Sequence, residues 1–209
     1  MKVGKFISFE GIDGSGKSTQ IKSLQSKLSL LGEECSVYRE PGGTIISEKI
    51  RQILLDKNNL DLSDRCESLL FFASRNQLLK QRIIPDLNKG LFVLCDRFND
   101  STIAYQGYGE NRDVESLNKT SSFATEGKQP DITFYLDIEV DLSIERRKLL
   151  INDRIEEKGL EYLGRVRKGF LELAEKESER IIVIDGSLDK ELISNKIWKV
   201  LKEKYDFKN

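Results

Sequence analysis

The sequence contains no histidine among its 209 residues. This absence excludes a histidine general base, a Ser-His-Asp triad and a histidine metal site. Cysteine is also scarce: Cys35, Cys66 and Cys95 are odd in number and far apart, and none belongs to a C-x-x-C pair. They indicate neither a disulfide framework nor a thiolate metal site, and we expect reduced, buried thiols as in cytoplasmic proteins.

Long apolar runs and an excess of positive charge are missing as well. No stretch approaches the roughly 18 apolar residues of a membrane span, and nothing before residue 9 resembles a signal peptide. Lys and Arg (34) are balanced by Asp and Glu (35), so the net charge is −1. We therefore expect a cytoplasmic protein without membrane or nucleic-acid partners, in which any bound nucleotide is small and held in a pocket.

Short apolar segments alternate along the chain with longer segments of helical periodicity. Those rich in Val, Ile, Phe or Tyr predict buried strands at 5–10, 35–40, 91–96, 132–137 and 180–185. Helices are predicted around 21–28 and 46–54, over 63–87 with a disturbance at Pro85, and over 113–126, 141–156, 160–178 and 189–204. This alternation predicts an α/β fold of three layers, a five-stranded parallel sheet with helices on both faces, in a single domain over 1–209.

Such a sheet binds ligands beyond the carboxyl ends of its strands. Several polar stretches fall there, and we expect them to share one cleft: GIDGSGKS (11–18), EPGGT (40–44), DRFNDS (96–101) and DIEVD (137–141).

The first of these stretches fits G-x-x-x-x-G-K-[ST] at every fixed position, between a predicted strand and a predicted helix. Its glycines let backbone N–H groups point at phosphate oxygens, and the helix N-terminus adds partial positive charge. Lys17 would bridge the β- and γ-phosphates of ATP, and the Ser18 hydroxyl would coordinate Mg²⁺. A chance glycine-rich turn is the alternative. The predicted ATP-binding residues are Gly11, Ile12, Asp13, Gly14, Ser15, Gly16, Lys17, Ser18 and Thr19.

Two residue pairs are further candidates. Asp96 ends the third predicted strand, where P-loop proteins carry an acid that orders Mg²⁺, and Arg97 beside it can neutralise a phosphate. An exposed ion pair is the alternative. Phe71 and Arg75 lie four apart on one helix face and suit a base, the ring by stacking and the guanidinium by donating to a carbonyl. Here the alternative is an ordinary core position.

Several motifs together resemble bacterial thymidylate kinase, a P-loop nucleoside monophosphate kinase family. They follow that family's order: FEGIDGSGKST (9–19), REPGGT (39–44), EKIRQILL (48–55), LLFFASR (69–75), CDRFNDSTIAYQG (95–107), QPDITFYLD (129–137) and DRIE (153–156). Many families share the P-loop, whereas REPGG, FFASR and DR…S…AYQG together are close to diagnostic. The resemblance implies a P-loop NTPase fold, phosphorylation of dTMP to dTDP by ATP and Mg²⁺ in dTTP synthesis, and a homodimer.

The resemblance also implies roles for single residues. Phe71 would stack on thymine, Arg75 would bond a base carbonyl, and Arg51 with Arg97 would hold the monophosphate. Ser18 and Asp96 would hold the metal. Pairing the base's carbonyl and N–H groups would reject analogues that leave those groups unpaired. The implied dTMP-binding set is Asp13, Glu40, Arg51, Phe71, Arg75, Arg97, Ser101, Thr102, Tyr105 and Gln106.

The acceptor phosphate has a second pKa of about 6, so it is largely a dianion at neutral pH and needs no general base. Catalysis then consists of aligning and neutralising two anions, with Lys17, Arg97 and a mobile arginine as catalytic residues. Relatives whose P-loop lacks arginine generally carry basic residues in a lid, here the segment of about 141–157. We expect Arg147 to be the lid arginine, although Leu149–Ile151 stand where some relatives carry arginine. A solvated basic helix face is the alternative.

Other functions remain open for a P-loop chain. A deoxynucleoside kinase would need a carboxylate base near the sugar, for which Glu40 is available, and another nucleoside monophosphate kinase would differ only in its acceptor. A nucleotide switch that hydrolyses ATP or GTP slowly is a third possibility. A GTPase should carry N-K-x-D, and NKTS (118–121) lacks the aspartate.

Overall fold

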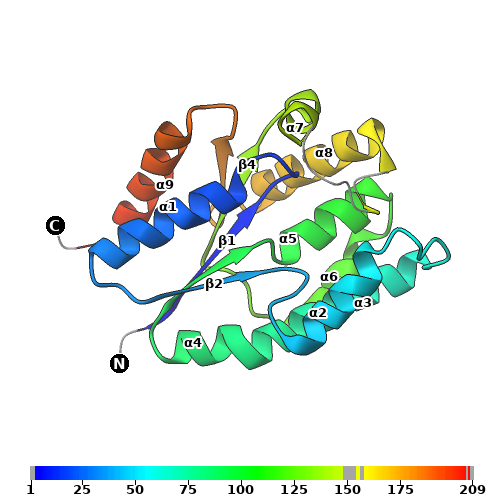
Figure 1. The fold of residues 1–209 in the computed structure, drawn as a ribbon, viewed down its shortest axis with the longest axis horizontal. Coiled ribbons are helices and arrows are strands. Elements are labelled where there is room, and N and C mark those ends of the chain that lie inside the picture. Colours follow the sequence, from blue (N-terminus) through cyan, green and yellow to red (C-terminus); the bar gives the residue numbers. More distant parts are fainter. Residues whose placement is uncertain (1–2, 148–153, 156–157, 206, 208–209) are drawn as a thin grey trace.

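The computed structural model describes residues 3–147, 154–155, 158–205 and 207 (Figure 1). Within them the chain forms a five-stranded sheet in the order β2-β3-β1-β4-β5, and every neighbouring pair is parallel. The strands are β1 (Lys5–Glu10), β2 (Cys35–Arg39), β3 (Phe92–Asp96), β4 (Ile132–Asp137) and β5 (Ile181–Asp185). Each observed strand begins and ends within one residue of its predicted bounds. The prediction succeeds because short, nearly continuous apolar runs are typical of buried parallel strands.

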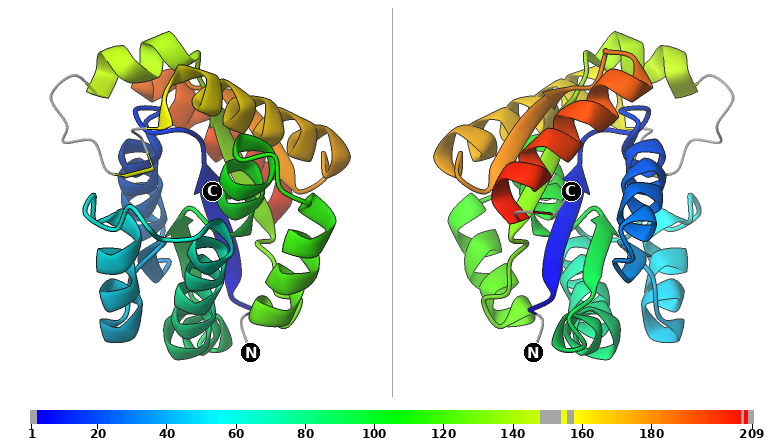
Figure 2. Two further views of the ribbon diagram at one scale, coloured as in Figure 1. Left: turned by 90° about the vertical axis from the view of Figure 1, so that its right-hand side faces the viewer. Right: turned by 90° about the vertical axis from the view of Figure 1, so that its left-hand side faces the viewer.

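Helices fill the connections and form a layer on each face of the sheet (Figure 2). They are α1 (Lys17–Leu30), α2 (Ile45–Leu55), α3 (Asp64–Leu78), the π-helix η1 (Leu79–Ile83), α4 (Ile84–Asn88), α5 (Asn99–Thr102), the π-helix η2 (Ile103–Gly109), α6 (Val114–Thr125), α7 (Val140–Arg147), α8 (Leu160–Lys176) and α9 (Lys190–Tyr205). The expected three-layer α/β fold is confirmed. Within the described residues no helix has the length and apolarity needed to cross a membrane.

The central strands β1, β3 and β4 are largely buried because hydrophobic clusters flank the sheet on both faces. On one face Ile7 and Phe9 of β1 pack in a cluster with Leu24 of α1 and Ile197 of α9. On the other face Phe6, the neighbour of Ile7 in β1, packs in a cluster with α3, η1 and α4. Burying one such side chain stabilises the fold by about 1.5–3 kcal/mol. The sheet is therefore a rigid support for the loops at its carboxyl edge.

The predicted helix over 63–87 is interrupted by π-helical turns. It runs as α3 to Leu78, continues as η1, and resumes as α4 with Pro85 in the first turn. Proline is tolerated there because the first turn of a helix does not use its N–H groups. The disturbance predicted at Pro85 is confirmed, and it takes the form of a wider π-helical stretch before the proline.

The predicted helix over 141–156 is too long. The described part of this helix is α7 (Val140–Arg147), and Arg154 and Ile155 lie in a turn. Leu149–Ile151 lie outside the described residues. The alternation of apolar and basic residues in this segment fits a helix, but residues 154 and 155 are held by contacts to distant parts of the chain instead.

The cysteines are all free thiols, as expected, but they are not all buried. Cys95 in β3 is buried, Cys35 is half-buried, and Cys66 in α3 is exposed. Cys66 stands one position before the buried Glu67, on the part of the helix that faces solvent. A sequence without an alignment does not show which face of this helix is covered.

Candidate active site

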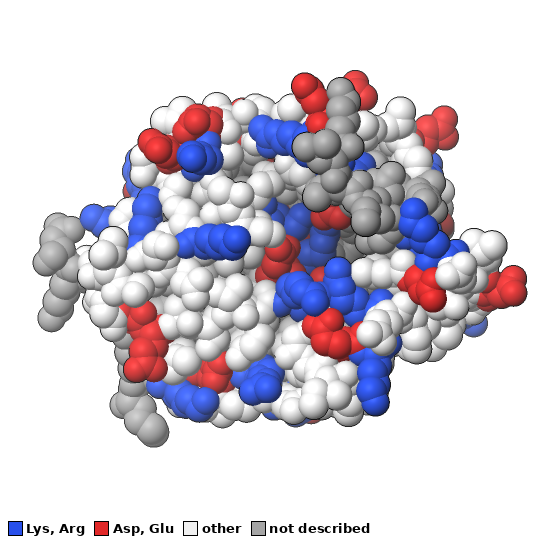
Figure 3. Space-filling view, viewed as in Figure 1, with Lys and Arg blue, Asp and Glu red and all other residues white. Residues whose placement is uncertain are grey.

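A cavity of about 610 Å³ opens at the carboxyl ends of β1, β2 and β3. On the molecular surface it is a hollow in which basic and acidic side chains gather (Figure 3). Three of the four stretches expected to share a cleft line it, whereas DIEVD (137–141) does not. Asp137 pairs instead with Arg167 of α8 at 2.8 Å. The predicted site residues that line the cavity are Asp13, Gly14, Gly16, Lys17, Ser18, Thr19, Glu40, Arg51, Phe71, Arg75, Asp96, Arg97, Ser101, Thr102, Tyr105 and Gln106.

The loop between β1 and α1 has the conformation that its glycines permit. Gly11, Gly14 and Gly16 have φ angles of 139°, 84° and 96°, in a region that other residues avoid. A Cβ on Gly14 would lie 2.9 Å from the carbonyl oxygen of Ser143, so α7 packs directly on this loop. The loop then continues into α1, whose first residue is Lys17. A strand, a glycine-rich turn and a helix N-terminus thus form an anion-binding loop.

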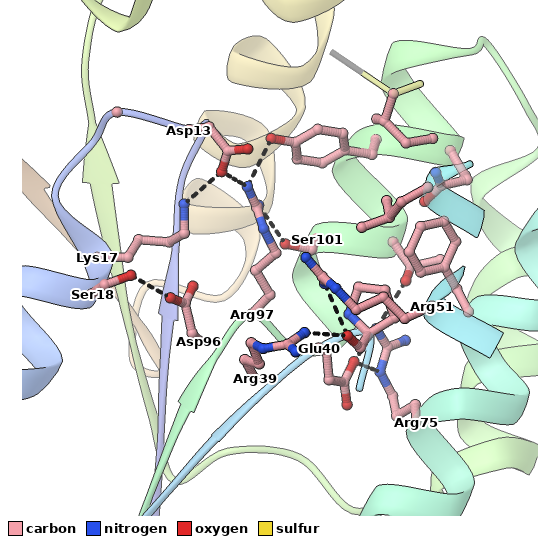
Figure 4. A pocket seen from close by; sticks show the side chains of 18 of the residues that line it. Asp13, Lys17, Ser18, Arg39, Glu40, Arg51, Arg75, Asp96, Arg97 and Ser101 are labelled. Atoms are coloured by element: carbon pink, nitrogen blue, oxygen red, sulfur yellow. Dashed lines mark hydrogen bonds and ion pairs between the residues drawn. The ribbon is translucent and has the colours of Figure 1, made fainter. Parts of the chain in front are cut away.

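Lys17 and Arg97 converge on one carboxylate oxygen of Asp13 (Figure 4). Lys17 Nζ lies 3.3 Å and Arg97 Nη2 2.5 Å from Asp13 Oδ1. Lys17 also donates to the carbonyl oxygen of Gly11 at 3.0 Å. Burial, and secondly the nearby charge of Arg97, lower the pKa of Lys17. The cation of the phosphate loop and the cation of the third strand therefore meet at one point in the cavity.

Ser18 and Asp96 lie together at the ends of α1 and β3. The Ser18 hydroxyl donates to Asp96 Oδ2 at 2.9 Å. Two adjacent oxygens suit Mg²⁺, which takes one or two protein ligands and completes its shell with water and phosphate oxygens. Within the described part of the chain no cluster of three or more His, Cys, Asp or Glu forms a metal site of its own. The donor set therefore fits a cation that arrives with a phosphate ligand.

The turn after β3 holds Arg97 in an unusual backbone conformation, with φ at 72°. A left-handed backbone conformation is strained for a residue other than glycine, and it persists only where surrounding contacts hold it. Glu10, the last residue of β1, does so: its carboxylate accepts from the Phe98 N–H at 2.6 Å and from the Ser101 hydroxyl at 2.5 Å. Burial, and next the charge of Asp100, raise the pKa of Glu10 to about 8.

Arg75 forms the floor of the cavity on the side of α3. It is 1% exposed, and it donates to Glu40 Oε2 at 2.6 Å and to Thr102 Oγ1 at 2.9 Å. Burial raises the pKa of Glu40, although the Arg75 charge opposes the rise. Glu40 Oε1 is buried and has no hydrogen-bond partner within the described residues. Phe71 lies one turn earlier on the same helix and lines the same cavity.

Arg51 and Arg39 converge on a single carbonyl group. Arg51 Nη1 donates to the Pro41 oxygen at 3.0 Å, and Arg39 Nη1 donates to the same oxygen at 3.1 Å. Arg39 also pairs with Glu48. In Figure 4 Lys17 and Arg97 meet at Asp13, Ser18 pairs with Asp96, and Arg75 pairs with Glu40.

Sequence reasoning missed several residues of this site. Arg39, Pro41, Leu55 and Ile155 line the cavity without having been predicted as site residues, and Glu10 supports it from below. Arg146 also lines it, although Arg147 was the residue preferred in the predicted lid segment. An acidic residue at the end of an apolar strand, directly before the phosphate loop, was the available signal for Glu10. Arg39 stands beside Glu40 in REPGG, so its place at a strand end was also visible.

The basic residues at the end of α7 and in the turn at residue 154 lie apart. Arg146 lines the cavity and donates to the carbonyl oxygens of Gly14 at 3.3 Å and Gly186 at 2.9 Å. Arg147 is buried, and its Cγ would lie 3.4 Å from a Cβ on Gly14, but it does not line the cavity. Arg154 lies at the opposite end, where it pairs with Glu67 at 2.6 Å. The candidate lid residues therefore do not converge on one phosphate.

The fold and this cavity define a P-loop NTPase-type α/β protein with room for a second anionic ligand opposite the phosphate loop. Comparison with known proteins narrows this class. The family model described as thymidylate kinase matches residues 9–197, and the chain belongs to the thymidylate kinase family.

The curated relatives agree with this assignment. The chain is 50% identical to the thymidylate kinase of Thermosipho africanus over 182 residues, which is 87% of this chain and 90% of that protein. It is 46% identical to that of Thermosipho melanesiensis over 94% of this chain and 96% of that protein. For Kosmotoga olearia the identity is 45% over 93% of each chain. The resemblance seen in the sequence motifs is thereby confirmed.

Proposed function

We propose that this chain transfers the γ-phosphoryl group of ATP to the phosphate of dTMP and releases dTDP and ADP. The observation that carries the proposal is the meeting of Lys17 and Arg97 on one oxygen of Asp13, inside a cavity that also contains Phe71 and Arg75. Cations from the two ends of the cavity face the same point. That point is where the phosphate chains of a donor and an acceptor nucleotide would meet.

The reaction needs positioning and neutralisation more than proton transfer. An oxygen of the dTMP dianion attacks the γ-phosphorus while the bond to the ADP oxygen breaks, so no proton has to be removed. Lys17 would hold the donor phosphates, Arg97 and Arg51 the acceptor phosphate, and Phe71 with Arg75 the base. Mg²⁺, held by Ser18 and Asp96 when bound, would neutralise the developing charge on the β- and γ-phosphate oxygens.

A coupled assay of ADP release tests this proposal against its alternatives. We expect turnover with dTMP to exceed turnover with CMP and AMP, whose bases lack the carbonyl beside an N–H that thymine presents. GMP presents such a pair only on the larger purine ring, and thymidine lacks the phosphate that Arg97 and Arg51 would hold. Greater activity with thymidine would support a deoxynucleoside kinase, and equal activity with AMP would overturn the acceptor assignment. ATP consumption without any acceptor would support a nucleotide switch.

We propose Arg147 as the lid arginine that neutralises charge on the transferred group. Arg147→Met is then expected to lower kcat by about 10³-fold, the lower end of what an arginine finger contributes. The matched comparison is Arg146→Met, one residue earlier on α7, for which we expect a smaller loss. Steady-state kinetics with ATP and dTMP measure both variants. A twofold loss for Arg147→Met would remove it from the mechanism, and a 10³-fold loss for Arg146→Met would transfer the role.

We also propose a homodimer. The resemblance implies one, and apolar side chains are exposed on helices that pack side by side, α2 against α3 and α3 against α6. Ile45 is 77% exposed, Leu69 58% and Phe123 87%. Such a face favours association. We expect sedimentation velocity to give a dimer for the wild type and a monomer for Ile45→Asp/Phe123→Asp. A dimer unaffected by these changes, or a monomeric wild type, would contradict the proposal.

We further propose that the protein works in the cytoplasm. Its cysteines are free thiols within the described chain, and one of them, Cys66, is exposed, which fits a reducing compartment. Cell fractionation followed by immunoblotting tests this, and recovery from the medium or an envelope fraction would contradict it.

A further inference from the structure

Glu67 is a buried carboxylate that adjoins the cavity without lining it. It lies in the first turn of α3, its side chain is 2% exposed, and it is not among the cavity residues. Its partners come from three separate parts of the chain: η2, the turn at 154, and Lys158 before α8. A carboxylate is rarely buried to this degree without a specific set of partners.

The two oxygens of Glu67 face in different directions. Oε1 accepts from the side-chain amide of Gln106, with Nε2 at 2.9 Å. Oε2 accepts from Arg154 Nη2 at 2.6 Å. Lys158 Nζ lies 3.4 Å from each oxygen. Oε1 therefore joins a residue of the cavity wall, Oε2 joins Arg154, and Lys158 lies near both oxygens.

These cations keep Glu67 ionised. Burial acts to raise its pKa, but the charge of Lys158 and the hydrogen bonds from Arg154 and Gln106 outweigh this, so the pKa of Glu67 is lowered. Lys158 is itself held by Glu110, so the cluster is compact. An ionised carboxylate accepts hydrogen bonds and donates none.

An acceptor-only partner determines which way the Gln106 amide points. The NH₂ group must face Glu67, and because the amide is planar its carbonyl oxygen points elsewhere. Gln106 is 1% exposed and lines the cavity next to Arg75 and Thr102. We propose that Glu67 is a positioning residue that fixes the carbonyl oxygen of Gln106 as the hydrogen-bond acceptor of the base pocket. The inference rests on the proposed function, since it concerns the base of the acceptor nucleotide.

This polarity selects among pyrimidines. Thymine and uracil carry an N3–H donor beside the O4 carbonyl, which matches a Gln106 acceptor beside the Arg75 donor. Cytosine has a bare nitrogen at N3 and an amino group at C4, so it presents the opposite pattern to both residues. Two acceptors or two donors facing each other in a buried pocket leave polar groups unpaired, and this weakens binding.

The experiment measures dissociation constants for dTMP, dUMP and dCMP by calorimetry, on the wild type and Glu67→Gln. A glutamine at 67 can donate as well as accept, so the Gln106 amide can turn over. We expect the ratio Kd(dCMP)/Kd(dTMP) to fall by about tenfold or more. The ratio Kd(dUMP)/Kd(dTMP) should stay within about twofold, because these bases share the N3–H.

Glu110→Gln is the matched control, because it removes a carboxylate from the same cluster without touching Gln106. Glu67→Met is the second variant. Partial unfolding would raise the apparent dissociation constant of every nucleotide by the same factor, so it cancels in the ratios. An unchanged dCMP/dTMP ratio in both Glu67 variants would overturn the proposal. So would an equal change in Glu110→Gln, or an equal change in the dUMP ratio. A wild type without preference for dTMP over dCMP in this experiment, or over AMP in the coupled assay, would overturn the proposed function as well.

Discussion

Arg97→Met is expected to lower kcat by about 10⁴-fold, within the range that a transition-state arginine contributes to phosphoryl transfer. In the structure Arg97 donates to Asp13, to the Gly11 carbonyl at 3.0 Å and to the Ser101 hydroxyl at 3.1 Å. It thus contacts both the phosphate loop and Ser101 on the predicted acceptor side. Without it the acceptor dianion would approach the γ-phosphate with less of its charge neutralised.

The kinetic pattern distinguishes this role from a structural one. We expect the KM for ATP to change little and kcat to carry the loss, because the phosphate loop stays intact. Arg97 already occupies a left-handed backbone conformation, and methionine has no greater strain there than arginine. Arg65→Met, at an exposed position of α3, is the matched control and should keep full activity. A loss below tenfold for Arg97→Met would show that another group neutralises the phosphates.

Lys17→Met is expected to lower kcat by about 10⁴-fold and, unlike Arg97→Met, to raise the KM for ATP as well. Lys17 is 6% exposed and donates to Gly11 and Ile12 carbonyl oxygens and to Asp13. Its ammonium is therefore fixed within the loop before ATP arrives. Replacing it leaves the loop's N–H groups to hold the phosphates alone.

The matched control is Lys22→Met, which makes the same change at an exposed position of α1. Circular dichroism should show that both variants are folded, since Lys17 is not part of a hydrophobic cluster. Lys17→Met with wild-type kcat and KM would contradict the assignment of residues 11–19 to ATP, whatever the acceptor is.

Much of the site was visible in the sequence because it lies at strand ends. Asp96 and Arg97 follow an apolar run, and the carboxyl ends of parallel strands share one edge of the sheet. Phe71 and Arg75 were proposed because a spacing of four residues places side chains on one helix face, and both line the cavity. These inferences need only local periodicity and the direction of the strands.

The lid shows where such inferences stop. Arg146, Arg147 and Arg154 look equivalent as basic residues in one segment. In the structure Arg146 donates a hydrogen bond to the carbonyl oxygen of Gly14 in the phosphate loop. Arg154 instead donates to Glu67 on α3, at a sequence separation of 87. No local sequence pattern shows which of these arginines lies beside the phosphate loop and which beside α3. Their positions depend on how α7, α3 and η2 pack together.

The amino-acid sequence by itself determined the five-stranded sheet, the phosphate loop and the family. Each of these can be recognised from short stretches of sequence, without knowing which residues lie next to them in space. Only the tertiary structure decided that Asp13 joins Lys17 to Arg97 and that Glu10 supports the Arg97 turn. It also decided that Glu67 faces Gln106. The physical reason is that a buried charged group must find its partners in space, and those partners come from elements that only packing brings together.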